Sequence, residues 1–286
     1  MDLIKTGYYE EAFGNPFCRD RYGICFFRIL QGSSIHMFSP VSLGLDQWAL
    51  VMLAAFIIGL GKAGVKGLDV LTVLIMAFIF GGKNSTGIVL PLLCVADIAA
   101  VAWYNRHAQW SHFRKLIPWM AVGILFGLYV GKDMDEVLFR RIMAGIIIIT
   151  ILIVLMMEFR KSKDVPHHPL FSAGTGLVAG FTTMIGNLAG AFANLYFIAM
   201  RVTKNDFIGT SAWLFLCMNL FKLPLQAFYW NNIHAEGLVT DLYLLPALAL
   251  GFFGGIRIVE RLQDDTYRKV VLIFTLVGSV LMLLRS

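Results

Sequence analysis

Long apolar stretches separated by short polar gaps dominate the chain from residue 47 onward. A helix that crosses a bilayer uses about 20 apolar residues, so each stretch has the composition of a segment that spans or enters a membrane. The pattern predicts ten segments, at residues 47–61, 68–82, 87–104, 116–131, 142–157, 169–185, 188–200, 207–230, 240–256 and 269–284. Several are short or broken by glycine, and we expect these to be discontinuous or re-entrant.

The second half of the chain repeats the first. The matched positions are Gly123 with Gly251, Gly127 with Gly255, Arg140 with Arg268, Pro118 with Pro246, and Lys83-Asn84 with Lys204-Asn205. Five segments per half is an odd number, so the second half must enter the membrane with the opposite orientation. The sequence therefore predicts an all-α polytopic membrane protein with a leader at 1–46, a first repeat at 47–165 and a second, inverted repeat at 166–286.

Composition supports a membrane protein and leaves no room for a large water-soluble domain. The chain is 58% hydrophobic and 15% charged, with a mean hydropathy of +0.73. Its 24 basic residues outnumber 18 acidic ones, but they lie in the short gaps, so we expect a lipid bilayer and no nucleic acid as partner. With the gaps assigned alternately, fourteen basic residues fall on one side, which predicts that this side is cytoplasmic and that both termini are outside.

A glycine-rich segment, GLGKAG, begins at Gly59 and matches the dinucleotide-binding fingerprint. That fingerprint needs a strand, a turn and a helix, whereas apolar membrane segments flank this one. We interpret it as a helix interrupted at membrane depth, with Lys62 and Lys66 holding an anionic substrate. The alternative is that both lysines snorkel at the end of a span, with Asp69 neutralising Lys66.

The matching stretch of the second half, GFTTMIGNLAGAFAN, carries hydrogen-bonding side chains and no charge. Its candidate substrate contacts are Thr182, Thr183, Asn187 and Asn194. A pocket formed by both halves would be positive on one side and hydrogen-bonding on the other, which suits a small oxyanion.

Two ionisable residues lie well inside apolar segments, at Asp97 and Lys222. Charges at membrane depth are costly and often functional, so we expect Lys222, with Asn219 and Gln226 on its helix face, to be a second anion contact. Asp97 is then the candidate carrier of a coupling proton or ion. The alternative is that each of the two is paired internally.

Three glycines spaced by four, at Gly123, Gly127 and Gly131, predict a flat helix face for close packing within the chain or across a homodimer. The six histidines are expected in the leader or in loops, and no H-E-x-x-H motif occurs. We therefore predict no catalytic residue, no metal and no cofactor.

The duplicated arrangement resembles the sulfite exporter TauE/SafE family of membrane permeases over about residues 45–286. The second half carries Gly209-Thr210-Ser211 after Lys204-Asn205, whereas the first half departs from this motif with Lys83-Asn84-Ser85-Thr86-Gly87. The resemblance implies transport of sulfite or an organosulfonate such as sulfoacetate by alternating access, in a plasma membrane (the bacterial inner membrane). It also implies that Thr210 and Ser211 contact the substrate.

The residues leave two other classes of function open. A non-transporting scaffold or assembly factor would explain the packing glycines but not the buried Lys and Asp. A membrane-embedded enzyme would need a nucleophile and a base that meet at membrane depth, and the sequence offers no such pair.

Overall fold

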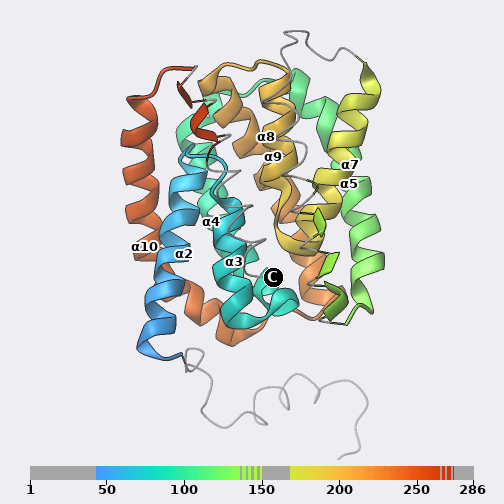
Figure 1. Ribbon diagram of the computed structural model, residues 1–286, viewed down its shortest axis with the longest axis vertical. Helices are drawn as coiled ribbons and strands as arrows, with labels where there is room; N and C mark the ends of the chain where they lie inside the picture. The colour runs from blue at the N-terminus through green and yellow to red at the C-terminus, as the bar shows by residue number, and fades with distance from the viewer. Residues whose placement is uncertain are drawn as a thin grey trace, which may run out of the picture. The chain divides into compact units, whose positions relative to one another are not determined.

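The computed structural model describes residues 43–135 and 168–264 and, with gaps, 137–149 and 266–273. Within these residues every regular element is helical. The elements are α2 (Leu45–Lys62), α3 (Asp69–Phe80), α4 (Gly82–Tyr104), the 3₁₀ turn η1 (Asn105–His107), α5 (Trp110–Lys132), α7 (Pro169–Gly186), α8 (Ala189–Ala199), α9 (Lys204–Pro224), the π-helical turn η2 (Leu225–Tyr229) and α10 (Ala235–Glu260) (Figure 1). The leader and the expected segments at 142–157 and 269–284 lie largely outside the described residues.

The other eight expected segments coincide with helices, but several helices begin earlier than predicted. Helix α4 begins at Gly82, so the polar residues expected as a turn form its first helical turn, where Ser85 Oγ donates to Gly82 O at 2.8 Å. Helix α5 begins at Trp110 and includes His112, which was expected in a loop. The ring of His112 lies 3.0 Å from the hydroxyl of Tyr196. Polar side chains are thus accommodated in these first turns by a backbone carbonyl of the same helix and by a side chain of α8.

Five helical stretches of the described chain are long and apolar enough to cross a membrane. They are α2, α4 with η1, α5, α9 with η2, and α10. Helices α3 and α8 have only 12 and 11 residues. At 1.5 Å per residue neither can cross a hydrocarbon core of about 30 Å, which agrees with the expectation of re-entrant segments.

The short helices belong to two helical hairpins. In the first, α2 ends at Lys62, and a turn through Gly64 (φ 119°) and Gly67 (φ 95°) leads into α3. In the second, α7 ends at Gly186 and is followed by Asn187, which has a left-handed φ of 57°, just before α8. Helix α2 begins at the lower end of the bundle in Figure 1, and α7 begins at its upper end.

Each hairpin packs its long helix against one long helix of the other half: α2 against α10, and α7 against α5. Glycines make both contacts close. A Cβ atom at Gly59 would lie 3.0 Å from the backbone of Gly251, and a Cβ atom at Gly123 would lie 3.0 Å from Gly180. The predicted glycine face of α5 is therefore used within the chain, and a homodimer, which stays a prediction, would need other surfaces.

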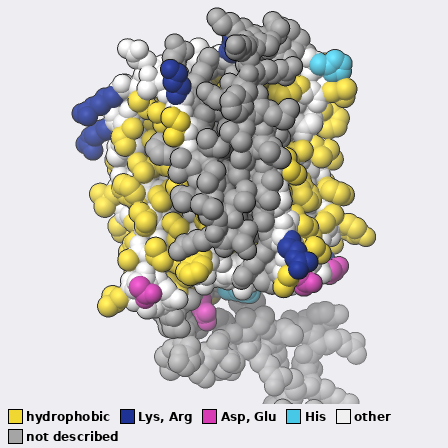
Figure 2. All heavy atoms as spheres, viewed as in Figure 1, with side chains coloured by type: hydrophobic (Ala, Val, Ile, Leu, Met, Phe, Trp, Pro, Cys, Tyr) yellow, Lys and Arg dark blue, Asp and Glu magenta, His cyan; other side chains and the backbone are white. Residues whose placement is uncertain are grey.

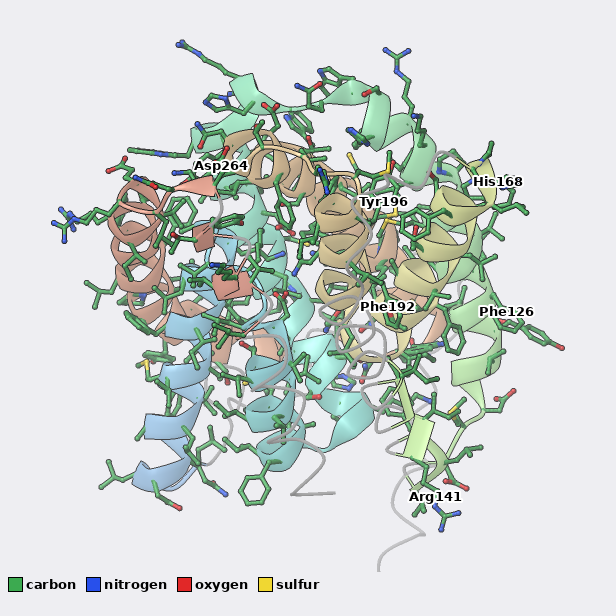
Figure 3. All side chains as sticks on the ribbon, turned by 45° about the horizontal axis from the view of Figure 1, so that its top comes forward. Phe126, Arg141, His168, Phe192, Tyr196 and Asp264 are labelled. Atoms are coloured by element: carbon green, nitrogen blue, oxygen red, sulfur yellow. The ribbon has the colours of Figure 1, made fainter. Side chains whose placement is uncertain are left out.

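On the face shown in Figure 2, the described side chains between the two ends of the bundle are mostly apolar, and charged side chains lie near the ends. Exposed apolar residues include Leu45, Phe228 and Leu250, which are 91%, 83% and 70% exposed. Phe126 of α5 lies at the outer edge, whereas Tyr196 lies inside (Figure 3). The apolar exterior fits a bilayer, since lipid tails replace water around it.

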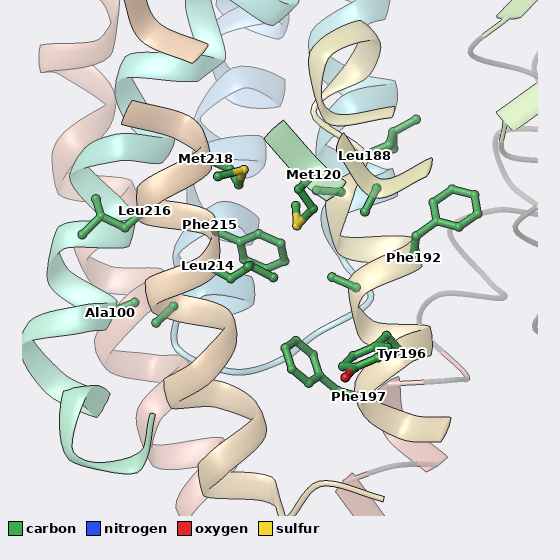
Figure 4. Close-up of a cluster of buried hydrophobic side chains, with 14 of the residues drawn as sticks. Ala100, Met120, Leu188, Phe192, Tyr196, Phe197, Leu214, Phe215, Leu216 and Met218 are labelled. Atoms are coloured by element: carbon green, nitrogen blue, oxygen red, sulfur yellow. The ribbon is translucent and has the colours of Figure 1, made fainter. Parts of the chain in front are cut away.

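Aromatic side chains fill the interior between α8 and α9. Figure 4 shows Phe215 of α9 and Phe197 of α8 pointing into the space between the two helices. Both side chains are buried, and Phe197 also contacts Phe207 with ring centroids 5.0 Å apart. This core supports the polar groups described next.

Candidate functional site

Residues from both halves of the chain surround one polar cavity, here called the central cavity. In this state it has room for about one water molecule, with about 20 Å³ open to the centre of a water-sized sphere. Its lining residues are Lys62, Asp69, Leu93, Thr183, Asn187, Ala189, Gly190, Phe215 and Asn219. The hairpin turns of both halves and the buried helices α4 and α9 thus meet at a single place.

The N-termini of the two short helices meet at the central cavity. Asp69 is the first residue of α3 and Ala189 is the first residue of α8. The contact is close, because a Cβ atom at Gly190 would overlap with the carboxylate of Asp69. Helix N-termini present unpaired N–H groups and a partial positive charge, so this end-to-end arrangement favours negative charge, part of which the carboxylate of Asp69 already supplies.

A buried ion pair links α2 to α4 beside the cavity. Lys62 Nζ lies 2.7 Å from Asp97 Oδ1, and Asn219 Nδ2 donates to Asp97 Oδ2 at 2.6 Å. Asp97 is 0% exposed. The carboxylate is therefore compensated by the charge of Lys62 from the first half of the chain and by the amide of Asn219 from the second half.

The ammonium group of Lys222 is bound by neutral acceptors only. It donates to the carbonyl oxygen and the hydroxyl of Thr183 at 3.0 and 2.9 Å, and to Asn187 Oδ1 at 2.7 Å. These contacts use the three donors of an ammonium group. None of the acceptors carries a formal charge, so Lys222 orients two cavity-lining side chains and leaves a positive charge next to the cavity.

Lys66 lies in the turn between α2 and α3 and is 3% exposed. Because the helix is interrupted here, as the sequence predicted, Lys62, Lys66 and Asp69 do not share one helix face. Burial of both lysines also overturns the snorkelling alternative, since snorkelling places the ammonium group in water. Instead, Lys62 Nζ and Lys66 Nζ lie 4.8 and 5.4 Å from the ring centroid of Phe215, which gathers both cations through its π face.

Thr210 and Ser211 are buried in α9, but neither lines the central cavity. Thr210 Oγ1 accepts from the backbone N–H of Gln109 at 2.8 Å, which fixes the connection before α5. Ser211 Oγ donates to Ile208 O at 3.0 Å within its own helix. Their contacts here are structural, and a role in binding substrate stays a prediction.

The remaining predicted site residues are all buried, but none of them lines the cavity. Thr182 Oγ1 donates to Ala179 O at 3.2 Å. Gln226 Oε1 accepts from Asn232 at 3.5 Å. Asn194 is 2% exposed, and neither atom of its amide has a hydrogen-bond partner.

Sequence reasoning missed two residues that the structure singles out. Phe215 has a spacing signal, because it lies four residues before Asn219 and seven before Lys222, on the same helix face. Asp241 of α10 is 6% exposed, and neither of its carboxyl oxygens has a hydrogen-bond partner. It lies near the start of its apolar stretch, so the sequence alone did not mark it as buried.

Comparison with known protein families gives one result. The family model described as Sulfite exporter TauE/SafE matches residues 48–282, which is most of the chain. Neither the curated proteins nor the solved structures compared with the chain give a match. The extent of the family match, together with the long apolar helices and the polar cavity between them, shows that this chain belongs to the sulfite exporter TauE/SafE family of membrane transporters.

Proposed function

We propose that the protein is a secondary transporter that moves sulfite or an organosulfonate such as sulfoacetate across a plasma membrane by alternating access. The central cavity carries this proposal. It brings the N-termini of two short helices to one place, with Lys62 in its wall and Lys66 and Lys222 close by. An anion that leaves water must have its lost hydration replaced, and charge-assisted hydrogen bonds are the strongest replacements that a protein offers.

The groups that line the cavity favour a small oxyanion. In this state the cavity has room for about one water molecule, so it must widen to admit the anion. Thr183 and Asn187 supply hydroxyl and amide groups that suit sulfonate oxygens, and Lys222 orients both of them. The apolar ring of Phe215 and the side chain of Leu93 complete the wall and suit a short carbon chain attached to the sulfonate.

The packing of the helices supports an inverted repeat that rocks about this cavity. Matched elements make matched contacts, since α2 packs on α10 of the second half and α7 packs on α5 of the first. Each half thus forms part of the support of the other. In transporters with this architecture, access alternates when one bundle moves as a rigid body against the other around a fixed site.

Asp97 is the candidate coupling group of this mechanism. Its carboxylate holds Lys62 in an ion pair, so a proton on Asp97 would release the Lys62 ammonium group to bind the substrate anion. Proton binding and anion binding then favour the same state. We expect Asp97→Asn to bind substrate yet to lose the stimulation of flux by a proton gradient. An Asp97→Asn variant that still concentrates substrate in response to that gradient would assign the residue to structure.

The experiment that tests the function is uptake of labelled sulfite and of labelled sulfoacetate into proteoliposomes that contain the purified protein. Transport of either anion, saturable and competed by the other, is the expected result. Uptake no faster than in protein-free liposomes, with a pH gradient imposed in either direction, would favour the scaffold alternative. Chemical conversion of either anion by the purified protein would favour the enzyme alternative.

A further inference from the structure

Two buried polar side chains lie one helical turn away from the central cavity without hydrogen-bond partners. Thr72 on α3 is 4% exposed, and its hydroxyl has no partner. Asn194 on α8 is 2% exposed, and both its amide oxygen and its amide nitrogen lack a partner. A buried polar group without a partner is destabilising, so these three atoms are unfavourable in this state of the protein.

Both residues continue the cavity-lining faces of the short helices. Thr72 follows Asp69 by three residues, and Asn194 follows Gly190 by four. Residues at these spacings share one face of a helix. Since Asp69 and Gly190 line the cavity, each orphan group lies on the cavity side of its helix, one turn further along.

The two helices lead from the cavity toward opposite ends of the bundle. Helix α3 runs into the start of α4, where Asn232, after η2, donates to Lys83 O at 2.8 Å. Helix α8 runs into the start of α9, where Lys204 Nζ donates to Leu262 O, after α10, at 2.6 Å. The full length of α9, and likewise of α10, separates these two ends, and each helix is long enough to cross a membrane. The two ends therefore lie at opposite faces of the membrane.

We infer that Thr72 and Asn194 line the two exits of the anion, Thr72 toward the face that contains Asn232 and Asn194 toward the face that contains Lys204. The inference rests on the proposed function. In each exit the hydroxyl or amide meets water and the passing anion when that exit opens, and becomes buried when it closes. The charge asymmetry of the loops makes the Asn194 exit the cytoplasmic one.

Sided cysteine labelling tests the two exits. Thr72→Cys and Asn194→Cys would each be treated with a membrane-impermeant maleimide in right-side-out and in inside-out vesicles, and mass spectrometry would locate the labelled residue. Thr72→Cys should react from the outside and Asn194→Cys from the cytoplasmic side. Leu195→Cys is the matched control, because Leu195 is the buried neighbour of Asn194 and lies off the helix face that Ala189 and Gly190 share. An open state that is populated at only a few per cent is enough to expose a thiol to the maleimide. Both exit positions should therefore be labelled at least about tenfold faster than this control.

Absence of label at both positions from either side, while Thr183→Cys in the cavity reacts, would overturn the inference. Reaction of both positions from one side would overturn it equally. The labelling would be repeated with sulfoacetate present, which should slow it at both positions. Labelling from the expected sides that sulfoacetate does not slow would support the exits and count against the proposed substrate. Sulfoacetate is the chosen protectant because sulfite itself consumes maleimides.

A second pair of variants keeps the inference testable if the cysteine variants fold poorly. Thr72→Val and Asn194→Leu remove the orphan polar atoms and keep similar side-chain volumes, so they should fold at least as well as the parent. Each should slow sulfoacetate flux severalfold while leaving binding to the detergent-solubilised protein unchanged. Unchanged flux in both variants would overturn the inference.

Discussion

Removing Lys62 should destabilise the protein far more than the loss of one exposed lysine. The substitution Lys62→Met deletes the ammonium group that lies 2.7 Å from Asp97 Oδ1 and leaves a carboxylate that is 0% exposed. Breaking a buried ion pair by removing one partner costs about 3–5 kcal/mol, because the remaining charge is left uncompensated. One hydrogen bond from Asn219 remains to offset part of this cost.

The double variant Lys62→Met/Asp97→Asn should recover most of the lost stability. An asparagine at position 97 can still accept the hydrogen bond from Asn219, and no charge remains buried without a partner. The two substitutions should therefore couple by more than about 2 kcal/mol, which lies within the range for residues in direct contact. Their effects on substrate binding should not recover, because the ammonium group is absent from both Lys62 variants.

The assay is unfolding of the detergent-solubilised protein, followed by intrinsic tryptophan fluorescence as denaturant is added. The free energies of unfolding of the parent, the two single variants and the double variant together form a double-mutant cycle. Additive effects of the two substitutions, or a cost of Lys62→Met below about 1 kcal/mol, would refute the buried ion pair, since exposed pairs contribute no more than that.

Lys66→Ala should weaken anion binding by more than about 1.5 kcal/mol, the lower figure for a hydrogen bond to a charged group, whereas the exposed Lys132→Ala should change little. Equal effects in a calorimetric titration would point to general surface electrostatics. Gly123→Ala should lower unfolding stability by about 1–3 kcal/mol, because its Cβ would overlap with the α7 backbone. Gly174→Ala, also in a helix but with free space for the Cβ, should cost no stability, since Ala favours a helix more than Gly does. Equal losses of stability in the two variants would argue against the α5–α7 contact. A cysteine in the connection at 231–234, before α10, should label from outside, and cytoplasmic labelling would reverse the predicted orientation.

The positions of the described helices could be predicted from the sequence because the hydrophobic pattern of membrane segments is strong. Their starts could not, because polar first turns such as the one at Lys83 look like loops when only hydropathy is considered. The topology count also included Lys62 and Lys66 as loop charges, and both are buried. Twelve basic residues remain on the predicted cytoplasmic side without them, so the predicted orientation is unchanged.

The residue types of the site could be predicted, but not the partners of each residue. Charged residues in apolar segments pointed to Asp97 and Lys222, whereas the ion pair with Lys62 depends on how α2 crosses α4. That geometry arises from contacts between residues far apart in the sequence. For the same reason the pattern did not distinguish Thr183, which lines the cavity, from its neighbour Thr182, which bonds within its own helix.

Counterflow in proteoliposomes tests the central claim most directly. Vesicles that contain the protein are loaded with unlabelled sulfoacetate and diluted into a trace of labelled sulfoacetate, without any ion gradient. An alternating-access carrier with one anion site between its halves should accumulate label transiently above the outside concentration, and Lys66→Ala should abolish this overshoot. Entry of label only to equilibrium, or entry independent of the internal load, would contradict the account.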